Sequence, residues 1–169
     1  DYKVLILSQC EALGTREADV IRQFARKGGT VIADVRPGLY DEHCKPRSEG
    51  ILDDLFGVSH TGNVEAMEVD GQIDGALGAS TVRTSLASLH VNPSVTLTAG
   101  TALGAAGDTP IMSVNDVGLG RAILMNFTVA TLPNLSRPDT DESAAELVST
   151  MFYEACVQWP LHLQDKQGA

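Results

Sequence analysis

The chain has 169 residues and a formal net charge of −10, with 12 lysines and arginines against 22 aspartates and glutamates. This length suits a single domain, and a hydrophobic content of 43% is enough for a buried core. The acidic balance argues against nucleic acid or an anionic membrane as the main partner, and the sequence shows neither a signal peptide nor an apolar run near the ~18 residues of a membrane span.

The first predicted elements form a strand–helix–strand unit. Residues 2–7 are a short apolar run typical of a buried strand. After a polar loop, Thr15 can cap a helix that reaches about Lys27 and that a pair of glycines ends. A second apolar strand follows over 30–35. The short connections predict two parallel strands in a βαβ unit, covered by helices.

The middle of the chain is less regular. A polar loop over 36–50 precedes a short helix over 51–56, which Gly57 ends. From 58 to 107, recurrent glycines divide the chain into short strands and turns. The run 94–98 alternates as a half-buried strand should, but the pattern fixes no register for this region.

Two further strand-like runs, 111–114 and 121–127, are separated by a turn that contains Gly118 and Gly120. A phosphate-binding role for these glycines would need a helix immediately after them, so that its N–H groups could meet the phosphate. The residues that follow form a strand pattern instead. The segment therefore predicts a β-hairpin.

The last predicted element is a helix that Asp139 can cap and Pro160 stops. A broad apolar stripe runs down this helix and includes Cys156, which we expect in the core. We therefore expect one α/β domain over residues 1–160 and a polar tail over 161–169.

Several of these segments resemble a known family. The first strand, helix and second strand, followed by Arg36-Pro37-Gly38, are similar to the glutamine-amidotransferase-like domain of bacterial glycoside hydrolases. The most similar version is the trimerisation domain of β-galactosidases in glycoside hydrolase family forty-two. Residues 52–58 resemble its middle segment, and 115–127 resemble its closing hairpin. The likeness covers roughly residues 2–60 and 108–128.

This resemblance implies a flavodoxin-like, doubly wound α/β fold with helices on both faces of the sheet, plus the C-terminal β-hairpin and a final helix. It also implies that the chain begins inside the domain and lacks the family's first strand and helix. In the family, the domain is an accessory module that follows a TIM-barrel catalytic domain and helps to build the oligomer. The expected partners are therefore the catalytic domain of the same parent chain and further copies of that chain, with no cofactor or metal.

Active class I amidotransferases hold a nucleophilic cysteine on a sharp turn after a strand, where backbone N–H groups stabilise the thiolate. The resemblance places Val35, Arg36 and Pro37 at that turn. None of these side chains can attack a carbonyl. The expected function is therefore a non-catalytic accessory domain of a larger bacterial glycoside hydrolase of the β-galactosidase type, without enzyme activity of its own.

Two cysteines keep a catalytic alternative open. Either Cys44, beside His43, or Cys10, just past the first strand, could serve a cysteine hydrolase or amidotransferase relative with a rearranged site. Adjacent residues in an extended loop point opposite ways, which places His43 poorly as a base for Cys44. The donors over 41–44 lack the spacing that would focus them on a metal. The odd number of cysteines and their spacing indicate reduced thiols and a cytoplasmic protein.

A third alternative is a carbohydrate- or metabolite-binding module. The polar loop lies at the carboxyl end of a predicted parallel strand, where open α/β sheets bind ligands. Asp34, at the end of that strand, is expected to bond backbone N–H groups of the next loop rather than to catalyse. The candidate contacts with a ligand or a neighbouring subunit are Arg36, Tyr40, Asp41, His43 and Arg47.

Overall fold

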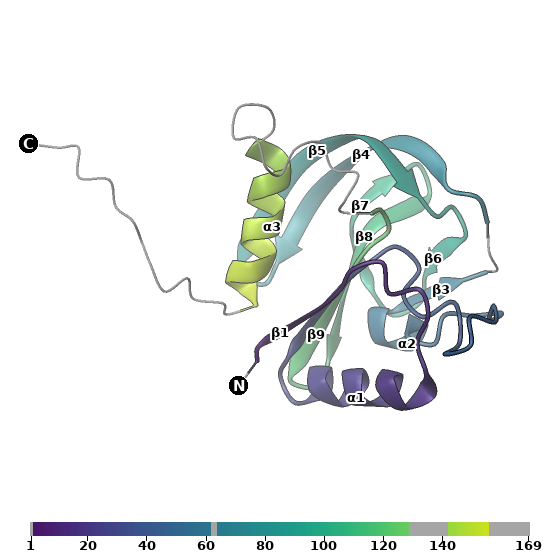
Figure 1. The fold of residues 1–169 in the computed structure, drawn as a ribbon. Helices are drawn as coiled ribbons and strands as arrows, with labels where there is room; N and C mark the ends of the chain where they lie inside the picture. The colour runs from purple at the N-terminus through teal and green to yellow at the C-terminus, as the bar shows by residue number, and fades with distance from the viewer. Residues whose placement is uncertain (1, 62–63, 129–141, 156–169) are drawn as a thin grey trace, which may run out of the picture.

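The computed structural model describes residues 2–61, 64–128 and 142–155, which form one curled sheet, a small two-stranded sheet and three helices (Figure 1). The elements are β1 (Val4–Leu7), α1 (Thr15–Arg26), β2 (Thr30–Asp34), α2 (Asp53–Phe56), β3 (Val58–His60), β4 (Met67–Leu77), β5 (Ser80–Val91), β6 (Val95–Leu97), β7 (Thr101–Ala106), β8 (Thr109–Val117), β9 (Gly120–Met125) and α3 (Glu142–Glu154). The large sheet has the order β1-β2-β9-β8-β7-β4-β5, and β3 pairs with β6. No helix in the described ranges is long and apolar enough to cross a membrane.

The predicted βαβ unit is confirmed. β1 and β2 are parallel neighbours, with Val4 opposite Thr30, and β9 runs parallel to β2 on its other side. Gly14, rather than Thr15, occupies the N-cap position of α1 and makes no side-chain cap. The glycines after the helix end it as predicted, because Gly28 adopts a φ of 105° that favours glycine.

The expected flavodoxin-like α/β fold with helices on both faces is wrong. One face of the parallel strands, which includes Val31 and Leu124, packs against α1 and α2. The opposite face, which includes Ile32 and Ile123, packs against the β4–β5 hairpin and α3 through residues such as Leu86. The sheet curls so that its own antiparallel strands cover a face that a flavodoxin-like domain covers with helices (Figure 1).

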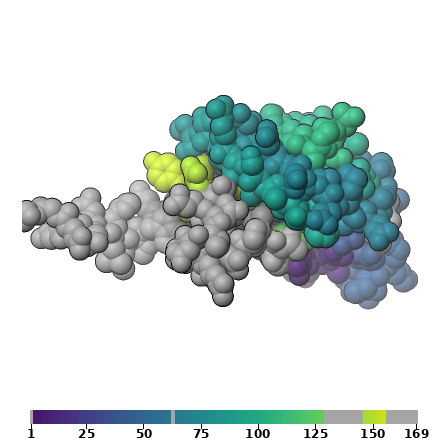
Figure 2. All heavy atoms as spheres, turned by 90° about the horizontal axis from the view of Figure 1, so that it is seen from above, coloured from purple at the N-terminus to yellow at the C-terminus, as the bar shows by residue number. Residues whose placement is uncertain are grey.

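The β4–β5 hairpin is the largest feature that the sequence did not predict. Its strands have 11 and 12 residues, and β5 alternates between buried and exposed side chains over most of its length. Gly71 and Gly75 lie inside β4 rather than in turns. A Cβ on Gly71 would lie 2.6 Å from Ile111, and one on Gly75 would lie 2.8 Å from Leu103. These glycines therefore make room for apolar side chains of neighbouring strands. Seen from above, the hairpin forms much of the upper surface (Figure 2).

The predicted hairpin over β8 and β9 is confirmed, with Val117 opposite Gly120 at its end. Its turn rests on the end of α1, because the Leu119 amide donates to the Arg26 carbonyl at 3.1 Å. A Cβ on Gly120 would lie 2.2 Å from the Gly29 carbonyl oxygen. The glycines of this turn thus allow close packing of backbone on backbone.

The final helix is present as α3, and it packs on the β4–β5 hairpin through Leu147 and Met151. The predicted cap Asp139, the predicted stop Pro160 and the core prediction for Cys156 lie outside the described residues. The predicted boundary between residues 1–160 and the tail 161–169 also lies outside them and stays a prediction.

Glu154 joins the last turn of α3 to the β4–β5 turn. Its carboxylate accepts hydrogen bonds from the Ser80 hydroxyl and, at 3.0 Å, from the Ala79 amide. These bonds, with a smaller contribution from Arg121, lower the pKa of Glu154. Because the folded pKa lies below the unfolded one, this stabilisation is present above the ordinary glutamate pKa and is lost as pH falls through the folded value.

We therefore expect Glu154→Gln to lower the melting temperature most near neutral pH. The difference from the unchanged chain should shrink as pH falls through the folded Glu154 pKa, because both side chains are then uncharged. Circular dichroism melts over a pH series measure this gap. A gap that stays constant down to low pH would show that the charge of Glu154 is not the stabilising feature.

Candidate functional site

The parallel strands β1, β2 and β9 end at the same edge of the sheet, and a pocket of about 490 Å³ lies there. The carboxyl edge of parallel strands is the usual ligand site of open α/β sheets. The pocket is lined by residues that directly follow the three strands: Gln9, Glu11, Ala12, Val35, Arg36 and Thr128. Two of the residues predicted at the turn, Val35 and Arg36, therefore lie in it.

The turns after β1 and β2 both place a non-glycine residue in the left-handed region of backbone conformation. Gln9 has a φ of 49° and Arg36 a φ of 59°. This conformation costs about 1 kcal/mol for such residues and is frequent at functional sites. The Arg36 guanidinium forms an ion pair with Glu11 at 3.0 Å. The residue at the sharp turn is thus an ion-paired cation with no capacity for nucleophilic attack.

Asp34 fixes the turn after β1. Its buried carboxylate accepts a hydrogen bond from the Gln9 amide and one from the Ser8 hydroxyl at 3.4 Å. Asp34 bonds a backbone N–H group, as expected of its residue type, but this group is the Gln9 amide in the loop after β1 and not an amide of the loop after β2. This carboxylate therefore stabilises the left-handed conformation of Gln9 in the turn after β1.

Cys10 is poorly suited to nucleophilic catalysis. It is partly buried, and its thiol faces the Ala12 carbonyl at 3.9 Å. Burial, with a smaller contribution from the Asp34 charge, raises the pKa of Cys10. A raised pKa lowers the thiolate fraction at neutral pH. In the described part of the chain, no histidine hydrogen-bonds to Cys10 or Cys44.

The segment around Cys44 is a tight turn rather than an extended loop. The Asp41 carboxylate accepts hydrogen bonds from the amides of Lys45 at 2.8 Å and His43 at 2.9 Å. Both hydrogen bonds lower the pKa of Asp41, and the bond from the Lys45 amide has the larger effect. Cys44 is exposed, with a φ of 60°. Asp41 therefore organises its own loop, which is the usual role of aspartate in such turns.

The other predicted contacts also build the loop. The Tyr40 amide donates to the Glu11 carbonyl at 2.9 Å, so the loop is joined to the segment that follows β1. Arg47 donates to the Leu13 carbonyl at 3.1 Å. Of the five predicted contacts, only Arg36 lines the pocket at the carboxyl edge.

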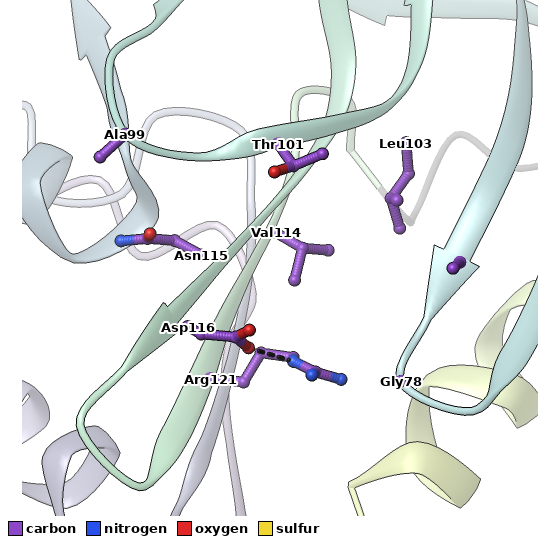
Figure 3. A pocket seen from close by; sticks show the side chains of 9 residues that line it. Gly78, Ala99, Thr101, Leu103, Val114, Asn115, Asp116 and Arg121 are labelled. Carbon is purple, nitrogen blue, oxygen red and sulfur yellow. Dashed lines mark hydrogen bonds and ion pairs between the residues drawn. The ribbon is translucent and has the colours of Figure 1, made fainter.

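A second pocket lies at the opposite end of β9, and the sequence does not predict it. Arg121 and Asp116 form an ion pair at 2.8 Å between β9 and β8, and this pair lines a pocket of about 420 Å³ (Figure 3). In the sequence, both residues belong to the segment that predicts a β-hairpin. Residues opposite each other on antiparallel strands are close in space, so the pairing register could have indicated the contact.

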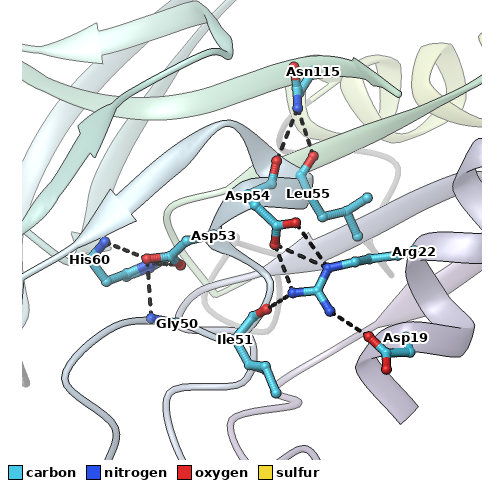
Figure 4. A network of polar contacts seen from close by, with 9 residues as sticks. All are labelled: Asp19, Arg22, Gly50, Ile51, Asp53, Asp54, Leu55, His60 and Asn115. Atoms are coloured by element: carbon cyan, nitrogen blue, oxygen red, sulfur yellow. Dashed lines mark hydrogen bonds and ion pairs between the residues drawn. The ribbon is translucent and has the colours of Figure 1, made fainter. Parts of the chain in front are cut away.

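A polar network around α2 was also missed (Figure 4). His60 is fully buried, and its Nδ1 lies 2.7 Å from the Asp53 carboxylate. Beside it, the Arg22 guanidinium bonds Asp54 and, at 3.1 Å, Asp19. An aspartate–histidine pair can support a nucleophile, but here no described group bonds the His60 Nε2 atom. The network therefore serves to hold α2 in place.

The structure describes possible metal-ligating side chains within residues 2–61, 64–128 and 142–155. No group of three or more histidine, cysteine, aspartate or glutamate side chains is arranged there to hold a metal ion. Of the donors over 41–44, the Asp41 carboxylate already accepts hydrogen bonds from two amides of its own turn.

The two described thiols should differ in reactivity. Iodoacetamide is expected to label exposed Cys44 several-fold faster than Cys10 at mildly alkaline pH, because Cys10 is partly buried and its pKa is raised. The labelling rate of Cys10 should rise only at a higher pH than that of a free cysteine. Peptide mass spectrometry separates the two sites. Faster labelling of Cys10 would identify an activated thiol and would revive the catalytic alternative.

No protein-family model matches the chain, and comparison with curated proteins found no match. Solved structures do match. The GH42 β-galactosidase Gan42B, from G. stearothermophilus, has a TM-score of 0.68 and 18% identity over 95% of this chain and 22% of its own. The β-galactosidase of Rahnella sp. R3 has a TM-score of 0.68 and 17% identity, and the match covers 93% of this chain and 23% of the enzyme. A cytoplasmic protein of Salmonella typhimurium LT2 has a TM-score of 0.59 and 10% identity, and the match covers 90% of this chain and 71% of that protein. At these identities the likeness establishes the fold, and the chain spans under a quarter of the β-galactosidases.

Proposed function

We propose that this chain is a non-catalytic accessory domain of a larger bacterial glycoside hydrolase of the β-galactosidase type, and that it contributes to packing between domains and between subunits. The observation that carries the proposal is the extent of the fold likeness. It takes in 95% of this chain but only 22% of Gan42B. A chain whose whole fold matches one part of a larger enzyme is expected to be such a part.

The carboxyl-edge pocket supports the non-catalytic role. The residue on its sharp turn, Arg36, is engaged with Glu11, and the nearest thiol, Cys10, has a raised pKa. A pocket with an ion pair at the nucleophile position suits contact with a neighbouring polar surface better than acyl transfer.

We also propose that another strand of the parent polypeptide pairs with the outer edge of β1. No described strand lies on that edge, and Ile6 is 52% exposed. The Thr30 amide donates to the Lys3 carbonyl, so in a parallel ladder the amides of Val4 and Ile6 face outward. β1 contains no charged residue or proline, the residue types that usually prevent further strand pairing at a sheet edge.

Hydrogen exchange tests this pairing. The Val4 and Ile6 amides should exchange with deuterium quickly in this chain and slowly in the parent polypeptide. Equal exchange rates would contradict the pairing.

The length of the native polypeptide tests the accessory role. Antibodies raised against this chain should capture a polypeptide several times larger than 17.9 kDa that hydrolyses a β-galactoside. Light scattering of that polypeptide, with and without residues 2–155, tests the oligomer. We expect the truncated form to be a smaller oligomer. A native polypeptide of 17.9 kDa would overturn the accessory role, and an unchanged oligomer would overturn the role in assembly.

The catalytic alternative is tested on the chain itself. We expect no hydrolysis of glutamine or of ester substrates by the purified chain, with or without Cys44→Ser or Cys10→Ser. Hydrolysis that either substitution abolishes would establish a cysteine hydrolase.

The carbohydrate-binding alternative is tested by thermal denaturation. If the loop over 36–47 binds carbohydrate, galactosides should raise the melting temperature of the chain, and Arg47→Ala should remove this increase.

A further inference from the structure

The Asp116–Arg121 ion pair stands between two hollow regions of the surface. One is the pocket of about 420 Å³ between β4, β7 and β8 (Figure 3). The other, of about 450 Å³, lies between β9, the start of β2 and the end of α3. Both are lined by Asp116 and Arg121. Each volume falls within the range of about 300–1,000 Å³ that is typical of small-molecule sites.

The geometry of the pair leaves polar atoms available for a ligand. The Asp116 Oδ1 atom accepts a hydrogen bond from the Arg121 Nε atom at 2.8 Å. The second carboxylate oxygen and the terminal guanidinium nitrogens have no hydrogen-bond partner in the described part of the chain. The Arg121 side chain is 26% exposed, and that of Asp116 is 74% exposed. An acceptor and a donor are therefore held side by side at the surface.

This arrangement matches the chemistry of adjacent hydroxyl groups. Each hydroxyl can donate one hydrogen bond and accept others. A carboxylate oxygen next to a guanidinium N–H can therefore bond two neighbouring hydroxyls at once, one as acceptor and one as donor. Bonds of this kind to charged groups are stronger than neutral ones.

The surroundings supply further polar atoms and apolar surface. Lys3, Thr30 and Glu154 line the second pocket with the ion pair. Leu119, at the tip of the β8–β9 turn, also lines this pocket, and its side chain is 86% exposed. A sugar ring presents hydroxyls at its edge and C–H groups on its faces, so it needs both kinds of surface.

We propose that Asp116 and Arg121 form the centre of a binding site for a neutral saccharide that carries adjacent hydroxyl groups. The site lies at the opposite end of β9 from the carboxyl-edge pocket and from the loop over 36–47. The inference is independent of the accessory role, because a saccharide site can exist on a domain of any parent protein. Its failure would leave the native-polypeptide test unaffected.

The test is a titration of ¹⁵N-labelled chain with lactose, followed by amide chemical shifts. We expect saturable changes confined to residues of the two pockets. Asp116→Asn removes the charged acceptor and should raise the Kd by about tenfold or more. Arg121→Lys keeps the positive charge but loses the planar donor pair, so it should also weaken binding. Unchanged shifts outside the pockets verify that each variant is folded.

A second ion pair provides the matched control. Asp74 and Arg83 form the same type of contact at 3.0 Å on β4 and β5, but neither residue lines either pocket. Asp74→Asn should leave the Kd for lactose unchanged within about twofold. No shift changes with lactose would overturn the proposal, as would equal weakening by Asp74→Asn and Asp116→Asn.

Discussion

Replacing Gly57 by alanine is expected to destabilise the protein severely. Gly57 ends α2 with a φ of 65°, and its carbonyl accepts hydrogen bonds from three successive amides that include Gly100 at 2.9 Å. A Cβ at this position would lie 2.2 Å from the Gly100 backbone nitrogen. Backbone cannot move aside as a flexible side chain can. We expect a loss of about 3–5 kcal/mol, from the left-handed conformation and the steric overlap together.

Gly107 provides the matched control for Gly57. It has a φ of 60°, but no atom lies within 4 Å of a Cβ added there. Gly107→Ala should therefore cost only about 1 kcal/mol, the price of the left-handed conformation alone. Urea denaturation followed by circular dichroism measures both variants. Similar losses would show that the overlap with Gly100 is relieved by backbone movement.

The part of the fold that could be predicted from the sequence is the part with short-range signals. The βαβ unit has two apolar strands, a helix of regular spacing and a glycine exit, all within the first 34 residues. The β8–β9 hairpin has a glycine-containing turn between two strand-like runs. Each element carries its own boundary residues, so its identity does not depend on distant contacts.

The β4–β5 hairpin could not be predicted in the same way. Gly71 and Gly75 interrupt the apolar pattern of β4, and in a sequence such glycines indicate turns. Their actual purpose, to admit Ile111 and Leu103, is visible only when β7 and β8 are in place. Without this hairpin, the second face of the parallel strands lacks a cover, and helices are the natural expectation.

The candidate site was predictable in position and only partly in composition. The turn after β2 follows from the βαβ unit, and this turn brings Arg36 to the wall of the pocket. Glu11, Gln9 and Thr128 enter the pocket from two other strand ends, and their approach depends on the sheet order. The sequence does not show that Asp41 bonds amides of its own turn or that Arg47 reaches the Leu13 carbonyl, and their contact with a ligand or a subunit stays a prediction.

The second large effect is expected at Asp53, whose carboxylate is 13% exposed on α2. It accepts hydrogen bonds from the Gly50 amide at 3.1 Å, the His60 amide at 2.8 Å and the His60 Nδ1 atom at 2.7 Å. Asp53→Ala leaves these buried donors without an acceptor, at about 1–3 kcal/mol for each such group. We therefore expect a loss of at least about 3 kcal/mol, measured by urea denaturation.

A variant of the neighbouring Asp54 is the control that distinguishes the effect of a buried hydrogen-bond acceptor from the effect of a negative charge. The Asp54 side chain is on the same short helix and bonds Arg22, but it is 60% exposed. Asp54→Ala should cost only about 1 kcal/mol or less, because Asp54 is exposed and the Arg22 guanidinium keeps its contacts with Asp19 and with the Ile51 carbonyl. Asp53→Asn removes the charge but keeps an amide oxygen that can accept from the Gly50 and His60 amides, which both bond Oδ2 of Asp53, so it should cost clearly less than Asp53→Ala. If Asp54→Ala were as costly as Asp53→Ala, stability would depend on the acidic charge of α2 and not on the acceptor that joins α2 to β3.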